Sequence, residues 1–445
     1  MSSLADRLRG VVGHSSGARS SVGRALSGAP GGPDKVRPTG SVDNAAELLG
    51  GEWCELRGER FLVIDRKYPP GHRHGHVAVA DTLPPENGCW SRLPLLNNPT
   101  TSGPRPGRML FVDLETTGLA GGAGTYAFLV GCAWYQDGSL RTRQFFLSNF
   151  AAERVLLEAV ADIADTSGVV VTYNGKSFDL PLIETRFLLH RLETPFAGVP
   201  HVDMLHPARR LWHREEDDEG LVPPKPRSGE GGCRLSTLEQ TLCGHVREGD
   251  VPGFEIPSRY FHFVRTGDAR GLAAVTEHNR LDLLSLAMLA AHASQLLEDG
   301  PAAARTSREA LGMGRFYERA AMTVEARTAY LHAAGHRETD TITSAEAWRA
   351  YAALSRRERR FEDAANGWRR ILELPRCPPA IVREASEALA VHHEHRLRDL
   401  QAARSFARQS LTLQATPSRR QATQHRLARL DRKLGESGPV HAALF

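Results

Sequence analysis

Four acidic residues at three separate points of the 445-residue chain carry its strongest chemical signal. Asp113 and Glu115 lie in FVDLETTG, Asp179 ends YNGKSFD, and Asp282 ends EHNRLD. Carboxylates that gather at one place repel one another unless cations hold them together. A divalent-metal site is an economical explanation, and hydrolysis of phosphodiester bonds is chemistry that such a site performs.

The spacing of Asp113 and Glu115 fits one face of a strand, because side chains alternate and Leu114 separates the two acids. The following Thr116, Thr117 and Gly118 offer hydroxyls and a backbone that a ligand can approach closely. An Asp-x-Glu tripeptide is common by chance, so two ordinary surface acids remain an alternative.

Asp179 follows the strand-like run GVVVTY, and ligands commonly bind beyond the carboxyl ends of strands in open α/β sheets. Asn174, Lys176 and Phe178 lie in the same loop and are candidate substrate contacts. Asp179 could instead cap the next helix, and the two roles can coexist. Asp203 in HVDML could support the site or cap a helix.

His278 precedes Asp282 by four residues in a segment that we expect to be helical, so the two side chains share a face. A neutral imidazole there could take a proton from a metal-bound water. The alternative is a structural or exposed histidine. The His-rich stretch HRHGH (72–76) could likewise bind a metal or be a solvated loop.

The elements that would position these residues follow from the apolar patterns. Strands are expected at 109–115, 126–138, 140–147 and 168–175, and helices at 151–164, 180–192 and 278–297. The order β-β-β-α-β-α is typical of a ribonuclease H-like sheet, in which three antiparallel strands precede parallel crossovers.

The flanking segments differ from this central pattern. Residues 1–43 are predicted to be a disordered tail, 44–108 a small β-rich lead-in with a linker, 109–298 the α/β domain with an exposed insertion at 215–232, and 302–436 an all-α region. Five residues at repeat-like spacing resemble a tetratricopeptide unit, namely Trp348, Tyr351, Phe361, Ala364 and Trp368. An ordinary helical bundle is the alternative.

Composition sets further bounds. The longest apolar stretch, 283–297, is too short to span a bilayer, and six scattered cysteines without a CxxC pair argue against a zinc ribbon or a disulfide framework. We therefore expect a cytoplasmic protein.

Charge is distributed unevenly along the chain. Residues 301–445 contain 25 Arg and Lys against 16 Asp and Glu, a net charge of +9, whereas the rest of the chain carries −5. A nucleic-acid partner and a merely solvated helical surface are both compatible with this asymmetry, as they are for the RRERR run at 356–360.

The three motifs together resemble those of the DEDD group of exonucleases in the ribonuclease H-like superfamily. Longer strings over 45–297, such as VVTYNGKSFDLPLIETRF and VPGFEIPSRYF, resemble its YprB-like branch. The better-known exonucleases place His five residues, or Tyr four residues, before the last Asp. Here His278 takes the four-residue spacing, a departure from the family pattern that concerns its role as base and not the role of the acids as ligands.

The resemblance implies two-metal hydrolysis of DNA or RNA from a 3′ end, with two Mg²⁺ or Mn²⁺ ions. Asp113 would bridge both ions, Glu115 and Asp282 would complete the ion that activates water, Asp179 would hold the second, and His278 would deprotonate the water. The helical region would bind nucleic acid or a protein partner. The alternatives are an inactive nucleic-acid-binding scaffold and a nucleotide phosphohydrolase.

Overall fold

The structure is a computed structural model that describes residues 44–85, 89–97, 107–118, 124–213, 233–337, 339–413 and 416–436. The expected tail at 1–43 and the whole expected insertion at 215–232 lie outside these ranges. Within them, no helix is long and apolar enough to cross a membrane. No disulfide joins the six cysteines, all of which are described.

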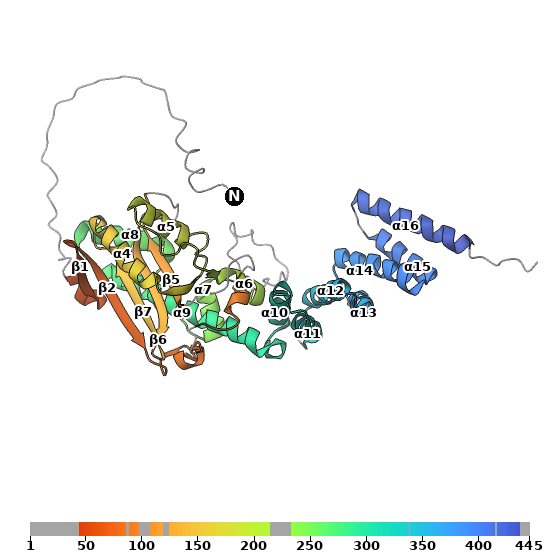
Figure 1. Ribbon diagram of the computed structural model, residues 1–445, viewed down its shortest axis with the longest axis horizontal. Helices are drawn as coiled ribbons and strands as arrows, with labels where there is room; N and C mark the ends of the chain where they lie inside the picture. The colour runs from red at the N-terminus through yellow and green to blue at the C-terminus, as the bar shows by residue number, and fades with distance from the viewer. Residues whose placement is uncertain are drawn as a thin grey trace, which may run out of the picture. The chain divides into compact units, whose positions relative to one another are not determined.

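A seven-stranded mixed sheet forms the centre of the α/β region (Figure 1). Its order is β1 (Glu52–Leu56), β2 (Glu59–Tyr68), β7 (Ser139–Phe146), β6 (Ala127–Gln136), β5 (Arg108–Thr116), β8 (Ser167–Thr172) and β9 (His201–Asp203). The pairs from β1 to β5 are antiparallel, and β8 pairs in parallel with both β5 and β9. The predicted ribonuclease H-like architecture is confirmed, and strands of the lead-in extend the same sheet.

Strand β5 is apolar on both faces because each face packs against helices. Met109 and Phe111 belong to a core shared with α9 (Ala273–Asp299). Leu110 and Val112 belong to the opposite core, shared with α4 (Glu153–Ala164), α5 (Asp179–Leu189) and α8 (Ile256–Thr266). Alternation along the strand therefore directs Asp113 to the face that α9 covers.

The hairpin between β6 and β7 has a two-residue turn at Asp137 and Gly138, with φ of 52° and 66°. Positive φ at both positions is the type I′ geometry, whose twist matches that of paired strands. This turn fixes the register of the central antiparallel pair.

Short elements connect these layers. They are α2 (Ala45–Leu49), β3 (Arg73–His74), β4 (Val77–Ala78), η2 (Val79–Thr82), α3 (Leu93–Leu96), η3 (Phe150–Ala152), α6 (Leu205–Leu211), α7 (Leu235–Leu238), η4 (Glu239–Cys243), η5 (Gly253–Glu255) and η6 (Arg270–Leu272). The pair β3–β4 is a separate two-stranded sheet.

From residue 301 the described chain is helical, as predicted. The elements are η7 (Pro301–Ala303), α10 (Ser307–Arg319), α11 (Thr323–Gly335), α12 (Thr341–Arg357), α13 (Phe361–Glu373), α14 (Pro379–His392), η8 (His393–Leu397), α15 (Leu400–Thr412) and α16 (Pro417–Glu436). From α10 on, each α-helix packs against the next one along the chain.

Two local features shape these helices. The side chains of Asp340 and Asp399 accept hydrogen bonds from backbone N–H groups in the first turns of α12 and α15 and so cap them. At Gly367, an added Cβ would lie 3.0 Å from the Cβ of Ala352. The small residue allows α13 to pack closely on α12.

Candidate active site

One cleft of about 460 Å³ is lined by all five residues of the predicted catalytic set. They come from β5 (Asp113 and Glu115), the first turn of α5 (Asp179) and α9 (His278 and Asp282). Segments more than 160 residues apart in the chain thus contribute to one site, because β5 lies between β6 and β8 and α9 crosses its face.

Asp113 is held by a residue that sequence reasoning missed. The side-chain Nδ2 of Asn279 on α9 donates to Asp113 Oδ2 over 2.7 Å and contacts its backbone oxygen at 3.2 Å. Asn279 is fully buried, and its own Oδ1 accepts from Gln144 Nε2 at 2.8 Å. In the sequence, Asn279 directly follows His278 in EHNRLD, and this position is the feature that could have identified it as a site residue.

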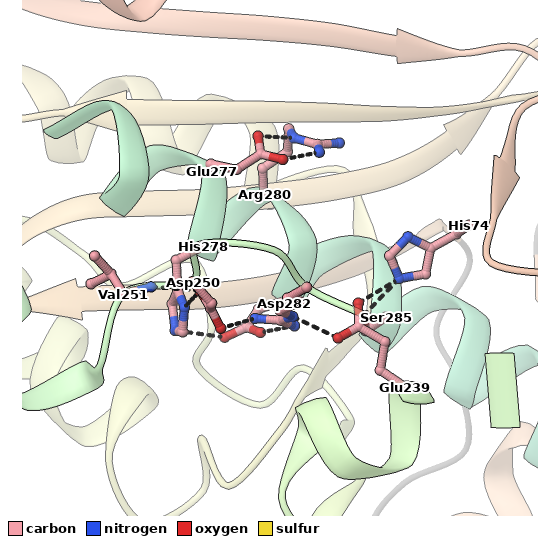
Figure 2. Close-up of polar contacts among 10 residues, drawn as sticks. His74, Glu239, Asp250, Val251, Glu277, His278, Arg280, Asp282 and Ser285 are labelled. Atoms are coloured by element: carbon pink, nitrogen blue, oxygen red, sulfur yellow. Dashed lines mark hydrogen bonds and ion pairs between the residues drawn. The ribbon is translucent and has the colours of Figure 1, made fainter. Parts of the chain in front are cut away.

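His278 is oriented by a second acid that the sequence motifs did not single out. Its Nδ1 lies 2.6 Å from Asp250 Oδ1, and its Nε2 lies 3.5 Å from Asp282 Oδ2 (Figure 2). If Nδ1 carries the proton and donates it to Asp250, Nε2 is left as an acceptor on the side of Asp282. Asp250 lies in the loop before η5, outside any regular motif spacing.

Asp282 has a cationic partner, Arg247. The guanidinium donates to Asp282 Oδ1 over 2.5 Å and to Glu239 Oε2 over 2.6 Å, and its side chain is only 5% exposed. Asp282 Oδ2 remains on the side of His278. One oxygen of this predicted metal ligand is therefore engaged by an arginine.

The network continues from Glu239 to the His-rich stretch. Glu239 Oε1 accepts from Ser285 Oγ at 2.7 Å and lies 2.7 Å from His74 Nε2 (Figure 2). His74 is 2% exposed, so at this residue the solvated-loop alternative is wrong. The lead-in is thereby connected to the candidate active site through Glu239 and Arg247.

Among the described residues, one group of three has ligand atoms all within 4.8 Å of one another: His74, Glu239 and His245. The two imidazoles are stacked, with centroids 4.2 Å apart and an interplanar angle of 24°. A metal ion lies near the plane of each ring that binds it, and two nearly parallel stacked planes do not meet at one ion. Glu239 is moreover already bonded to Arg247. We therefore interpret this group as a hydrogen-bonded support.

Three acids of the cleft have raised pKa values. Burial, followed by the charges of Asp282, Glu115 and Asp179, raises the pKa of Asp113 well above its usual value, against the opposing effect of Asn279. Burial and the charges of Asp282, Asp179 and Asp250 likewise raise the pKa of Glu115. Burial and the charges of Asp203 and Asp282 raise the pKa of Asp179 to about 7. Among the described residues, no cation contributes to the pKa of these three acids.

The predicted substrate contacts divide into two groups. Thr116, Gly118 and Phe178 line the cleft, and Phe178 is 56% exposed. Thr117 Oγ1 instead accepts a hydrogen bond from the backbone N–H of Tyr126. Asn174 and Lys176 do not line the cleft.

Asp203 accounts for the arrangement of the loop before α5. Its two carboxylate oxygens accept the backbone N–H groups of Asn174 at 2.7 Å and Lys176 at 3.1 Å. Asn174 has a φ of 63°, a left-handed conformation that asparagine tolerates. The N-cap residue of α5 is Phe178, so Asp179 is the first helical residue and not the cap.

Comparisons with known proteins agree with this fold. A family model described as the RNase H superfamily matches residues 110–294. Over 392 residues the chain is 30% identical to a Bacillus subtilis (strain 168) protein described as uncharacterized protein YprB, with 87% of this chain and 89% of that protein covered. The chain therefore belongs to the RNase H superfamily, in the family that includes YprB.

Proposed function

We propose that the protein is a divalent-metal-dependent nuclease that hydrolyses phosphodiester bonds of DNA or RNA, acting as a 3′–5′ exonuclease. The observation that carries this proposal is the convergence of four carboxylates and one histidine on a single cleft. Membership of the RNase H superfamily supports nuclease-type chemistry in general. The polarity and the exonucleolytic mode rest on the motif resemblance.

The donor set fits two hard cations. Carboxylate oxygens are the ligands that Mg²⁺ and Mn²⁺ prefer, and burial together with neighbouring carboxylates raises the pKa values of Asp113 and Asp179, which a bound cation would offset. Asp113, Glu115, Asp179 and Asp282 would hold the two ions.

The bound ions would supply Lewis acidity and stabilise the charge that develops on the attacking and leaving oxygens. The other tasks fall to the chain itself. His278 Nε2 would accept the proton of the attacking water, while Asp250 holds the imidazole in the required tautomer. Arg247 fixes the orientation of Asp282, and Asn279 fixes that of Asp113.

The helical region, for which we propose a tetratricopeptide-like arrangement, would hold substrate or a partner. Its support is the sequential packing of α10 to α16. The six cysteines, none in a disulfide, fit the reducing cytoplasm that we propose as its location.

The test is cleavage of end-labelled single strands of DNA and RNA, with free and blocked 3′ ends, in Mn²⁺ and in EDTA. Asp113→Ala should lower the rate by about a thousand-fold or more, because metal-bound charge stabilisation amounts to several kcal/mol. Asp162→Ala, a matched change of an exposed acid on α4, should leave the rate unchanged. Equal cleavage by wild type and Asp113→Ala, or none by wild type, would contradict the proposal.

A further inference from the structure

A second concave site lies within the helical region, on residues that the proposed catalysis does not use. It is a groove of about 580 Å³, which we call the arginine groove. Five arginines line it: Arg349 and Arg356 of α12, Arg383 of α14, and Arg419 and Arg426 of α16. Every second helix of the stack thus contributes guanidinium groups to one surface.

The groove carries an excess of positive charge. The acids in its lining are Glu384 and Glu387, so the lining has a net charge of +3. Arg349 pairs with Glu384 at 2.8 Å and Arg383 with Glu387 at 3.0 Å. A third pair joins Arg426 to Glu394 at 2.8 Å.

Two of the five guanidinium groups are available to a ligand. Within the described part of the chain, Arg356 and Arg419 form no ion pair, and both are exposed. Arg356 is the member of the RRERR run that lines the groove, whereas Arg357 pairs with Glu318 and Arg360 with Asp363. The run is therefore divided between a polar helix surface and the groove.

The lining offers hydrogen-bond donors but few acceptors. Its acceptor side chains are the two paired glutamates and Thr423, whose hydroxyl donates to the backbone oxygen of Arg419. An extended peptide needs partners for its N–H groups as well as its carbonyls. A phosphodiester backbone presents charged acceptor oxygens at every unit, which guanidinium groups bind well.

The spacing of the arginines also suits a repeating anion. Arg349 and Arg356 are seven residues apart on α12, and Arg419 and Arg426 are seven apart on α16. Seven residues of helix rise about 10.5 Å, so each helix places two guanidinium groups two turns apart, one of them ion-paired and the other available to a ligand. The lining also contains the apolar side chains of Trp368, Ile381 and Val391, and the exposed Val391 offers a surface against which a base or sugar could pack.

We propose that the arginine groove binds single-stranded nucleic acid through its phosphate backbone. This goes beyond the proposed cleavage, because the groove is built from other elements and its binding needs no metal. It is consistent with the net charge of +9 over 301–445.

The test compares the full-length chain with Arg356→Glu/Arg419→Glu. Binding of labelled single strands of about 20 nucleotides is followed by fluorescence anisotropy in EDTA over a range of salt concentrations. The control is Arg408→Glu/Arg432→Glu, which makes the same charge change on exposed arginines of α15 and α16 outside the groove. Thermal unfolding of each variant shows whether it folds.

The groove variant should bind about 10-fold or more weakly, and the slope of log affinity against log salt should shrink by about 1.4 for two lost phosphate contacts. The control should lose much less. An equal loss in both variants, no loss in either, or no binding by wild type at low salt would overturn the proposal.

Two further readouts separate the alternatives. If polyglutamate binds the wild type but not the groove variant while nucleic-acid binding is unchanged, the groove takes an acidic protein and the proposal is wrong. Cleavage in Mn²⁺ is measured in parallel. If the groove variant loses binding and the wild type does not cleave, the groove proposal stands and the nuclease proposal is wrong. If the wild type cleaves and the groove variant binds as tightly as the wild type, the nuclease proposal stands and the groove proposal is wrong.

Discussion

At the scale of single residues, the four acids of the cleft are not equivalent. Asp282 has Arg247 as a counter-charge, whereas in the described part of the chain Asp113 is held by the neutral amide of Asn279. The side chain of Asp179 has no cationic partner among the described residues. A group of like charges with one arginine is costly unless protons or cations are taken up. The protonation state of the acids should therefore depend on divalent metal.

This leads to a pH prediction for metal-free protein. The pKa of Asp179 rises from 3.8 to about 7 on folding, so between these values the unfolded chain releases a proton that the folded chain keeps. The free energy of unfolding therefore falls as pH rises through this window. Asp179→Asn removes the effect, so in EDTA its Tm should rise relative to wild type from about pH 5 to about pH 7.5.

Calorimetry or thermal-shift measurements at several pH values check this. Mn²⁺ at the upper end of the range should raise the Tm of wild type more than that of Asp179→Asn, because the deprotonated carboxylate binds the ion. A Tm difference that is independent of both pH and Mn²⁺ would contradict the assigned environment of Asp179.

Asp250 and His278 should act as one unit in catalysis. His278→Ala should lower kcat by about 100-fold or more, the usual contribution of a positioned base. Asp250→Asn should have a smaller effect, mainly on kcat. The amide can still form a hydrogen bond with His278 Nδ1, but because it can either accept or donate, it no longer selects one tautomer of the imidazole.

The double variant distinguishes this role from a structural one. If Asp250 acts through His278, the double variant should be no slower than His278→Ala alone. Fully additive losses in steady-state kinetics would show that Asp250 has an independent role. Mn²⁺ affinity, measured in the same variants, should change little.

At the scale of elements, helix α9 is the part that completes the site. It carries His278, Asn279 and Asp282 across the face of β5. Its close approach depends on Gly131 of β6, where an added Cβ would lie 2.3 Å from Asn279 Oδ1. A small residue on a neighbouring strand thereby permits the contact between Asn279 and Asp113.

Gly131→Ala should displace Asn279 and with it Asp113. We expect a loss of about 1–3 kcal/mol in the free energy of unfolding, as for other overpacked cores. Chemical denaturation measures this loss, and the rate of Mn²⁺-dependent cleavage should fall as well. Gly271→Ala is the matched control, since nothing lies within 4 Å of a Cβ there. Equal stability of the two variants would contradict the steric argument.

At the scale of the whole molecule, the sheet and the first helices of the C-terminal region share one hydrophobic core. The same cluster of buried residues includes Phe111 of β5, Leu286 of α9 and Phe316 of α10, and it ends at Leu354 of α12. The indole of Trp212 also donates to Glu309 Oε1 at 3.0 Å. The helical region is therefore partly a structural support for the α/β region.

Two truncations should behave differently for this reason. A chain ending at Asp299 loses α10 to α12 and exposes the shared core, so it should unfold at lower temperature and aggregate. A chain ending at Arg357 keeps every residue of that core and should retain Mn²⁺-dependent cleavage. Thermal unfolding and the cleavage assay check both. Equal stability of the two truncations would show that the shared core contributes nothing.

The sequence by itself determined the fold class and drew attention to the acids of the cleft. Apolar strands such as 109–115 and amphipathic helices are local patterns, and the spacing of Asp113 and Glu115 follows from side-chain alternation. The His278–Asp282 pair follows from helical periodicity in the same way. Such features can be predicted because the physics that produces them acts over a few residues.

Only the tertiary structure revealed Arg247, Asp250 and His74 as parts of the network around the site. None belongs to a periodic pattern, and each reaches its partner through packing of segments far apart in the chain. The tertiary structure also showed that the backbone N–H groups of Asn174 and Lys176 donate to Asp203, and that the lead-in strands belong to the central sheet. Contacts of this kind depend on how whole elements pack, and that information is spread over the entire sequence.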